Sequence, residues 1–296
     1  MTRSTAAGIH PLDHLVLPTQ TLDVARARLI ALGFVVAPTG SHPFGTENCC
    51  VFLADGTYLE PLAIGSEQIA FDAAAEGNAF VIRDRIYRGS RGDEGFSAVV
   101  LGTDNADADH ARYVEAGLSA GDTLSFSRAF TDTTGKSDTA SFKLAFASNS
   151  RATDAFLFAC QRINTPKVDR AALQAHPNGA TGIVEVVAVS DRPDEQRRLI
   201  SVAVGDPAAI GQGGAFRLPN AVLSILDPAS FAARFGIPAG LPTELRFAAV
   251  VFAVRDADAV SRLLAANAIP HDIAGNDIVV QPASGQGAAF IFREIP

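Results

Sequence analysis

One sequence pattern recurs four times along this chain of 296 residues. Each copy begins with a short apolar run, followed by Asp or Thr, about three turns of helix-forming sequence and further apolar runs. The copies begin at about Leu12, Gly95, Gly182 and Arg246. Supersecondary units that repeat in this way bury their apolar faces by packing on one another. We therefore expect four copies of a small α/β unit, although a non-repetitive α+β chain could show the same pattern.

The first copy opens with a strand that carries a histidine. Residues 12–17 are rich in branched apolar side chains and stop at Pro18, which predicts a buried strand. His14 interrupts this apolar run. Apolar positions then recur at helical spacing over residues 22–32, and Gly33 ends the predicted helix.

Three further strands are predicted to complete the first copy. One starts at Phe34, and two more cover residues 48–54 and 57–63. The last two are joined by Asp55-Gly56, a strong hairpin signal. The first copy is thus a β-α-β-β-β unit. The Ala-rich residues 66–92 follow it and predict one or two connecting helices.

The four units are expected to pair into two domains. Residues 164–180 are polar and contain Pro and Gly, which is typical of a linker. The predicted first domain covers residues 1–165, with units at about 10–65 and 94–163. The predicted second domain covers residues 166–296, with units at about 181–227 and 244–296.

Composition excludes several classes of function. With 48% apolar and 19% charged residues, the chain has the composition of an ordinary globular protein. There is no apolar run long enough to span a membrane and no secretory signal at the N-terminus, so we expect a cytoplasmic protein without a membrane partner. The net charge of −8 comes without a basic stripe, which argues against nucleic-acid binding. The 19 phenylalanines favour sheets with a covered apolar face.

The three cysteines are expected to be reduced thiols, at least one of them in the core. Cys49 and Cys50 are adjacent and Cys160 is far away, so the sequence has neither a disulfide framework nor a zinc-ribbon spacing. A cysteine nucleophile would need a nearby base and a lowered pKa. No spacing in the sequence predicts one.

Four polar residues in the first unit are candidates for a functional site. His14 lies in a predicted buried strand, and Glu60 lies inside an apolar strand where an unpaired charge would be costly. His42 and Asn48 lie in and after a Gly/Pro loop, a common location for functional groups. The structural alternatives are a hydrogen-bonded core histidine, a Glu60 that pairs with an arginine or with His14, and a turn at His42-Pro43 with Asn48 bonded to its own backbone.

The arrangement of these residues resembles a known family. Four β-α-β-β-β units, with Asp13-His14-Leu-Val-Leu opening the first and Gly56-Thr-Tyr-Leu-Glu60 closing it, resemble the vicinal oxygen chelate superfamily, in particular its glyoxalase-like domain proteins. Residues 41–48 and 176–180 also resemble segments of that group. The resemblance implies an α+β fold of two tandem domains, in which paired units form open, cup-shaped, eight-stranded mixed sheets with helices outside.

The resemblance also implies a metal site inside the cup. The first and last strands of each unit would contribute one ligand apiece, and His14 and Glu60 match these two positions. Imidazole and carboxylate are donors that zinc, iron, nickel and manganese accept. The ion would act as a Lewis acid toward an enolate or bind dioxygen, with Glu60 catalytic and His42 and Asn48 in contact with a small oxygenated substrate.

The other units depart from this pattern. In the second unit, the matching positions fall at about Ser97 and near Phe158, and neither is a good ligand. In the second domain, the matching positions fall near the following residues: Val184, Ala249, Ser224 and Phe292. Glu185 or Glu294 would take their place if the register differs by one residue, because such a shift reverses the face of a strand.

Two functions therefore compete at this stage. The first is a metal-dependent enzyme, a lyase, an isomerase or a dioxygenase, built on His14 and Glu60. The second is a metal-free protein that sequesters an apolar small molecule in a Phe-lined cup. The second domain could also be purely structural, packing on the first or mediating a homodimer. The remaining histidines have no predicted site role: we expect His10 and His271 at the surface and His176 to fix the linker.

Overall fold

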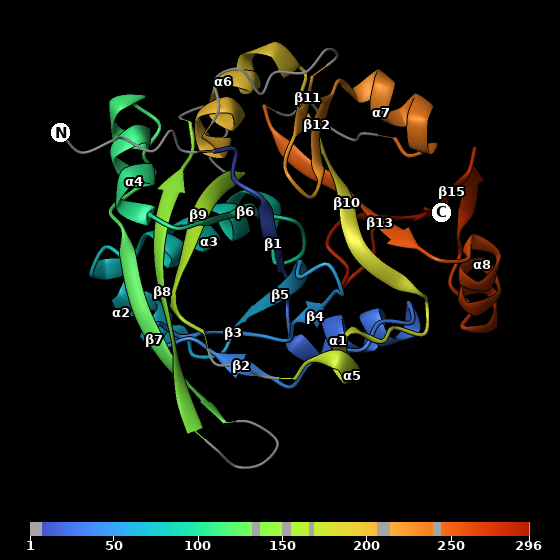
Figure 1. Ribbon diagram of the computed structural model, residues 1–296, viewed down its shortest axis with the longest axis horizontal. Helices are drawn as coiled ribbons and strands as arrows, with labels where there is room; N and C mark the ends of the chain where they lie inside the picture. Colours follow the sequence, from blue (N-terminus) through green and yellow to red (C-terminus); the bar gives the residue numbers. More distant parts are fainter. Residues whose placement is uncertain are drawn as a thin grey trace.

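The computed structural model describes residues 8–131, 137–149, 155–165, 169–205, 214–238 and 244–295. These residues form two mixed β-sheets that lie against each other, with helices packed around them (Figure 1). None of the helices in these ranges is both long enough and apolar enough to span a bilayer.

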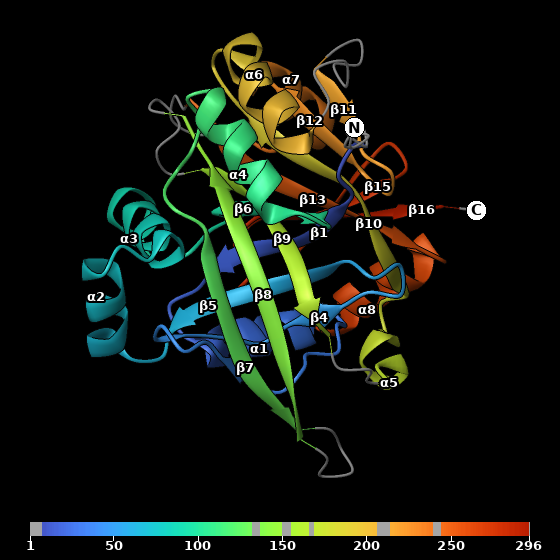
Figure 2. The same ribbon diagram turned by 60° about the vertical axis from the view of Figure 1, so that its left-hand side comes forward.

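The first sheet is built from residues 12–164. Its strands, within the described residues, are β1 (Leu12–Pro18), β2 (Gly40–Ser41), β3 (Thr46–Asn48), β4 (Val51–Phe52), β5 (Tyr58–Ile64), β6 (Ala98–Thr103), β7 (Leu124–Thr131), β8 (Ser137–Ala147) and β9 (Phe156–Asn164). They are ordered β2-β3-β5-β1-β6-β9-β8-β7, and β4 pairs with β5. The sheet is strongly curved, and the long hairpin of β7 and β8 extends along one side of it (Figure 2).

The second sheet is built from residues 180–294. Its strands, again within the described residues, are β10 (Ala180–Val189), β11 (Ala215–Arg217), β12 (Val222–Leu226), β13 (Arg246–Val254), β14 (Asp272–Ala274), β15 (Asp277–Val280) and β16 (Ala289–Glu294). They are ordered β11-β12-β10-β13-β16-β15-β14.

Both sheets have the same plan at their centre. The first strands of two successive units, β1 and β6 or β10 and β13, lie antiparallel side by side. Each of them pairs in parallel with the last strand of its own unit: β5, β9, β12 and β16. Each parallel pair requires a crossover connection, and in every unit the crossover contains the helix that the sequence predicts.

The helices begin at side chains suited to cap them. Thr21 accepts a hydrogen bond from the backbone of Val24, and Asn105 and Asp256 do the same for the helices that follow them. The helices are α1 (Leu22–Ala31), α2 (Glu67–Ala75), α3 (Ala79–Arg91), α4 (Ala106–Glu115), α5 (Ala171–Gln174), α6 (Pro193–Val204), α7 (Pro228–Phe235) and α8 (Ala257–Ala266). The connection predicted over residues 66–92 is thus two helices.

The outer faces of both sheets share one hydrophobic core. Leu15 of β1 and Leu157 of β9 belong to the same buried cluster as Val186 of β10 and Phe290 of β16. Side chains of α1, α4, α6 and α8 complete this cluster. Much of the apolar surface of each sheet is therefore buried against the other.

The side chain of Phe34 joins the two sheets. It is 3% exposed, and its ring centroid lies 5.2 Å from that of Phe252 and 6.1 Å from those of Phe290 and Phe292. The prediction of a strand starting at Phe34 was wrong. The backbone N–H of the next residue, Val35, donates to Nδ1 of His176 instead of to a neighbouring strand, so this segment packs across the chain rather than along a sheet.

The end of the predicted linker is fixed to the first sheet by polar contacts. Nε2 of His176 lies 2.9 Å from the carbonyl oxygen of Phe52, and the Asn178 side chain donates to the carbonyl of Leu32. Asp55, at the hairpin between β4 and β5, accepts a hydrogen bond from the backbone of Ile183. The expected role of His176 as a linker anchor agrees with these contacts.

Two other histidines are less exposed than the sequence predicted. His10 is 8% exposed, and its Nε2 lies 2.7 Å from a carboxylate oxygen of Asp109. His271 is half-buried, and its Nε2 lies 2.8 Å from the hydroxyl of Ser261. The prediction of a surface position was therefore wrong for His10, which is buried against Asp109 of α4. His271 remains partly exposed.

Candidate functional site

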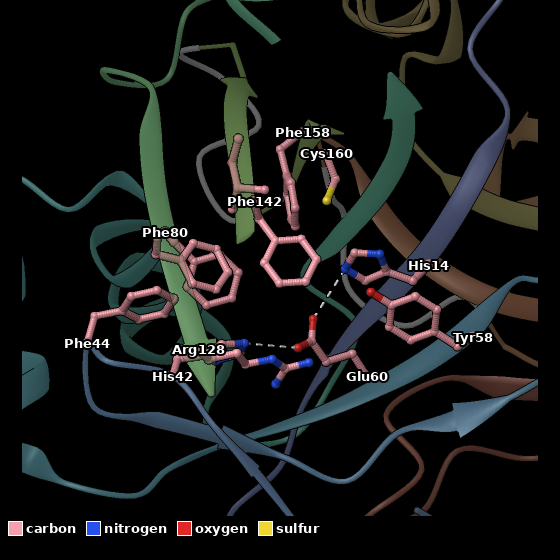
Figure 3. A pocket seen from close by; sticks show the side chains of 12 residues that line it. His14, His42, Phe44, Tyr58, Glu60, Phe80, Arg128, Phe142, Phe158 and Cys160 are labelled. Carbon is pink, nitrogen blue, oxygen red and sulfur yellow. Dashed lines mark ion pairs between the residues drawn. The ribbon is translucent and has the colours of Figure 1, made fainter. Parts of the chain in front are cut away.

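His14 and Glu60 face each other in the concave interior of the first sheet (Figure 3). His14 lies on β1 and Glu60 on the neighbouring parallel strand β5, where Glu60 pairs in register with Val16. Since side chains two residues apart lie on the same face of a strand, both groups point into the cup. Nε2 of His14 is 3.3 Å from Oε2 of Glu60, and the two residues are 4% and 6% exposed.

Asp13 orients the imidazole of His14. Its carboxylate oxygen lies 2.6 Å from Nδ1, so Nδ1 carries a proton and donates it, and Nε2 is directed at Glu60. Arg162 donates to the same oxygen at 2.8 Å and balances the charge of Asp13. Burial alone lowers the pKa of His14, but the hydrogen bonds to Asp13 and Glu60 outweigh it and place the pKa above the ordinary 6.5. The ring is held in place by Tyr58, which stacks on it at 4.3 Å.

Glu60 is ionised although it is buried. Burial raises its pKa, but the hydrogen bond and the charge of His14 outweigh burial, and the resulting pKa is about 2. Asn48 donates to Oε1 at 2.7 Å. The alternative in which the Asn48 side chain bonds its own backbone is therefore wrong, since this side chain bonds Glu60. The carboxylate is thus fixed from two sides by groups that favour its charged form.

His42 is the second imidazole beside Glu60 and is neutral. Burial has the largest effect on the pKa of His42 and lowers it to about 4. The Asn48 amide N–H₂ lies 3.4 Å from Nε2 of His42, and Nδ1 lies 2.9 Å from the hydroxyl of Thr46. Nε2 is therefore an acceptor, and it lies 3.6 Å from Oε1 of Glu60. All four candidate residues predicted from the sequence meet at one point.

Arg128 is a residue of this site that the sequence analysis missed. It projects from β7 into the cavity beside Glu60, and its charge contributes to the lowered pKa of that carboxylate (Figure 3). The backbone at Gly40 approaches both Arg128 and Asn48 so closely that a Cβ there would contact them. The signal in the sequence was the alternation Leu124, Phe126, Arg128, which places the arginine on the apolar face of the strand.

The cavity at the His14–Glu60 pair is small and has mostly aromatic walls. Its volume is about 30 Å³, which is room for an ion or for roughly two to three water molecules at about 10–15 Å³ each. The aromatic residues that line it are Phe44, Tyr58, Phe80, Phe126, Phe142 and Phe158. Helix α3 covers the inner face of the sheet and supplies Phe80 to this lining. An organic ligand would need these side chains to shift.

The second unit of the first sheet has apolar residues at the positions that match His14 and Glu60. The pairing of Ala98 with Phe156 and of Val100 with Phe158 corresponds to the pairing of His14 with Tyr58 and of Val16 with Glu60. The counterpart of Glu60 is therefore Phe158. The counterpart of His14 is Ala98, one residue beyond the predicted Ser97.

In the second sheet, the counterpart of His14 is Glu185 rather than Val184. Glu185 pairs with Val222 and Val187 pairs with Ser224, which again repeats the register of β1 and β5. Ser224, predicted as the counterpart of Glu60, donates to Glu185 at 2.8 Å. Arg234 of α7 binds both carboxylate oxygens of Glu185, at 2.8 and 2.5 Å. Glu185 is thus neutralised by an arginine and is not available as a ligand.

The last unit has apolar residues at the matching positions. Ala249 faces the interior of the second sheet, as predicted. The matching residue of β16 is Ile291, which pairs with Val251, whereas Phe292 packs in the core shared by the two sheets. Glu294 accepts a hydrogen bond from the first turn of α8 and is not part of a site. Phe231 and Phe235 of α7 fill the interior of this sheet.

The ion pair of Glu185 predicts a pH-dependent contribution to stability. Burial raises its pKa, but Arg234 and Ser224 lower it below the ordinary 4.5, so the pair stabilises the fold above about pH 4.5 and loses its effect as the pH falls through the folded-state pKa. We expect Glu185→Gln to lower the free energy of unfolding by about 2 kcal/mol at pH 7. This loss is smaller than that expected from breaking a fully buried ion pair, because a third of the Arg234 side chain is exposed to solvent.

Urea unfolding at pH 7, 5 and 3 measures this difference. The gap between Glu185→Gln and the wild type is expected to shrink toward pH 3. Glu115→Gln, at an exposed position of α4, is the matched control and should show little change at any pH. A gap of the same size at pH 3 and pH 7 would contradict the assignment.

Among the described residues, no group of three or more His, Cys, Asp and Glu side chains is close enough to hold a metal ion. His14 and Glu60 would supply two protein donors to a metal at this site. The cysteines are all free and buried, and burial raises the pKa of Cys49 to about 11. They are protonated thiols at neutral pH, so they are poor nucleophiles and poor ligands.

Comparison with known proteins gives one family match. The model of a family described as a glyoxalase-like domain matches residues 12–203. None of the curated proteins matches the sequence.

Solved structures of similar fold cover nearly the whole chain. A hypothetical protein from Staphylococcus aureus matches with a TM-score of 0.65 and 14% identity, over 96% of this chain and 99% of its own. A mutant 4-hydroxymandelate synthase from Streptomyces coelicolor matches with a TM-score of 0.57 and 13% identity, over 97% and 93%. A Mn(II)-bound glyoxalase from Novosphingobium aromaticivorans matches with a TM-score of 0.52 and 10% identity, over 97% and 83%. At these low sequence identities, the comparisons show a similarity of fold alone.

Proposed function

The chain belongs to the glyoxalase-like domain family, and we propose that it is a metal-dependent enzyme of the glyoxalase/dioxygenase type that acts on a small oxygenated organic molecule. The observation that carries this proposal is the approach of His14 Nε2 to Glu60 Oε2, at 3.3 Å, inside the concave face of a sheet. The fold is shared with a Mn(II)-bound glyoxalase and with a 4-hydroxymandelate synthase, which supports the reaction type.

The spacing of the two donors, His14 and Glu60, fits a divalent ion. Two ligands that each lie about 2.0–2.2 Å from one ion are roughly 3.0–3.5 Å apart when they are adjacent in its coordination shell, and the observed separation falls in this range. Asp13 accepts the hydrogen bond of the other imidazole nitrogen, as an outer carboxylate commonly does for a metal-bound histidine. An ion would replace the proton that the raised pKa of His14 keeps between the two groups.

The residues around the candidate ion position would hold the ion and orient the substrate. A divalent ion, when bound, supplies a Lewis acid that polarises a substrate oxygen. Glu60 is ionised and can serve as a charged ligand, while Asn48 holds its carboxylate in place. The neutral His42 faces the same point and can orient a substrate hydroxyl by accepting its hydrogen bond. The aromatic lining makes the walls of this cavity mostly apolar.

Metal analysis tests the proposal. Protein purified without a chelator is expected to contain about one equivalent of a transition metal, and His14→Ala and Glu60→Ala are each expected to lose it. His271→Ala, which removes a histidine bonded to Ser261 on the second sheet's side of the molecule, is the matched control. Wild-type protein without a transition metal, or unchanged occupancy in the two site variants, would remove the proposal.

The hydrogen bond between Asp13 and His14 predicts a partial loss of metal affinity when Asp13 is replaced. We expect Asp13→Asn to weaken metal affinity by about 10- to 100-fold, because an outer-shell partner tunes the basicity and orientation of the ligand. Competition with a chromophoric chelator measures the change. Asp72→Asn, on the surface helix α2, should leave the affinity unaltered. Equal affinities for Asp13→Asn and the wild type would mean that Asp13 acts only on His14 in the metal-free protein.

A metal-free binding protein is the second candidate. It is favoured by the apolar counterparts Ala98 and Phe158 in the second unit and by the aromatic lining of the cavity. An apolar compound that raises the melting temperature of chelator-treated protein would support it. Stabilisation seen only after metal is restored would favour the enzyme.

A further inference from the structure

A second cavity, beside the His14–Glu60 pair, is lined by three arginines. Arg128, Arg162 and Arg170 border it together with one carboxylate, Glu60. Its volume is about 60 Å³, room for roughly four to six waters or for one small anionic group. The two cavities share four residues, which are Tyr58, Glu60, Arg128 and Phe142. A molecule in the second cavity would therefore lie directly against the candidate site.

The charges around this cavity do not cancel. Arg162 is paired with Asp13 at 2.8 Å, and Glu60 is paired with His14 at 3.3 Å. In the part of the chain that the structure describes, no carboxylate lies within ion-pair distance of Arg128 or Arg170. Among the described residues, two guanidinium charges remain at this cavity after the two pairs are subtracted, in a protein whose net charge is −8. Burial lowers the pKa of Arg170, and the charges of Arg162 and Arg128 add to this effect.

Aromatic rings hold the arginines in place. The guanidinium carbon of Arg170 lies 4.3 Å from the centroid of the Phe52 ring. That of Arg162 lies 5.9 Å from Tyr58, and that of Arg128 lies 5.9 Å from Phe142. Because stacking engages the face of a guanidinium, its N–H groups remain directed outward from the edge. Within the described ranges, neither Arg128 nor Arg170 donates a side-chain hydrogen bond to another residue.

We propose that this cavity, defined by Arg128, Arg162 and Arg170, binds an oxyanion group of the substrate, a carboxylate or a phosphate. Guanidinium edges bind both groups through charge-assisted hydrogen bonds. The inference rests on the proposed function, since the bound group would direct the rest of a small organic acid past Phe142 toward His14 and Glu60 (Figure 3). The substrate class is thereby narrowed to small oxygenated anions.

Binding of small probes to chelator-treated protein tests this inference. Pyruvate, its neutral ester methyl pyruvate and inorganic phosphate are titrated separately by calorimetry, after the chelator has been removed by dialysis against metal-free buffer. We expect pyruvate or phosphate to bind and methyl pyruvate not to bind at the same concentrations. Arg170→Gln and Arg128→Gln are each expected to weaken anion binding by about tenfold or more, as loss of a charged hydrogen bond does. Tighter binding of pyruvate would assign the site to carboxylates, and tighter binding of phosphate would assign it to phosphates.

Matched variants keep the test separate from folding and from the metal. Arg262→Gln, whose side chain on α8 is 70% exposed, should bind the anions as the wild type does. Arg170→Lys, which keeps the charge, should retain more affinity than Arg170→Gln if both unfold at the wild-type temperature. Methyl pyruvate binding as tightly as pyruvate, or unchanged affinity in Arg170→Gln and Arg128→Gln, would overturn the inference. Anion binding by a protein that takes up no metal would instead contradict only the proposed metal-dependent function.

Discussion

A chain that ends at Thr165 is expected to lack a cooperative unfolding transition and to aggregate when it is expressed alone. The outer face of the first sheet, including Leu15 and Leu157, belongs to the same buried cluster as Val186 and Phe290 of the second. Truncation would expose this apolar face to water, and exposed apolar patches of such extent lead to association. The loss is expected to be close to the whole free energy of folding, which is about 5–15 kcal/mol for a natural domain.

Circular dichroism and thermal unfolding of the purified fragment measure this effect. The control is co-expression of residues 1–165 with residues 166–296, which should restore a soluble complex because the shared core can form again. A soluble fragment 1–165 that unfolds cooperatively would contradict the expectation. It would also revive the view that the second half of the chain is only an appended structural domain.

Phe34→Ala is expected to produce the largest loss of stability of any single substitution considered above. The ring is 3% exposed and contacts Phe252, Phe290 and Phe292 from the opposite sheet. Replacing a buried Phe by Ala costs about 3–5 kcal/mol, because transfer free energy is lost and a cavity remains. Urea denaturation should show a midpoint shift with an unchanged slope if the unfolding stays two-state.

Phe71→Ala is the matched control for Phe34→Ala. Phe71 is 57% exposed on α2, where its main contact is the guanidinium of Arg85 at 5.4 Å. The control should change the free energy of unfolding by no more than about 0.5–1 kcal/mol. If Phe34→Ala were as mild as Phe71→Ala, the two sheets would not depend on each other for stability in the way the packing indicates.

Local periodicity accounts for the parts of the fold that were predicted correctly. The strands at residues 12–17 and 57–63 and the helix over residues 22–32 are encoded in short windows, where apolar spacing and capping residues act directly. The hairpin at Asp55-Gly56 is local in the same sense, and Gly56 has a positive φ of 93°. The predicted strand at Phe34 failed because that residue packs against a segment more than two hundred positions away.

Register limited what could be predicted of the site. A strand exposes alternate residues to opposite faces, so an error of one residue exchanges inside and outside. This is why Glu185 rather than Val184, and Ile291 rather than Phe292, face the interior of the second sheet. Backbone hydrogen bonding between strands decides which residues face the interior. The sequence of a single strand does not contain this pairing.

The sequence by itself determined the repeated units and placed His14 and Glu60 on the first and last strands of one of them, because strand and helix signals are local. Only the tertiary structure decided that Arg128 and Arg170 meet beside Glu60, since they come from β7 and from the segment before α5. It also decided that Arg234 neutralises Glu185 and that one core serves both sheets. Electrostatic pairing and close packing depend on distances of a few ångströms between residues far apart in the chain, and these distances exist only once the chain has folded.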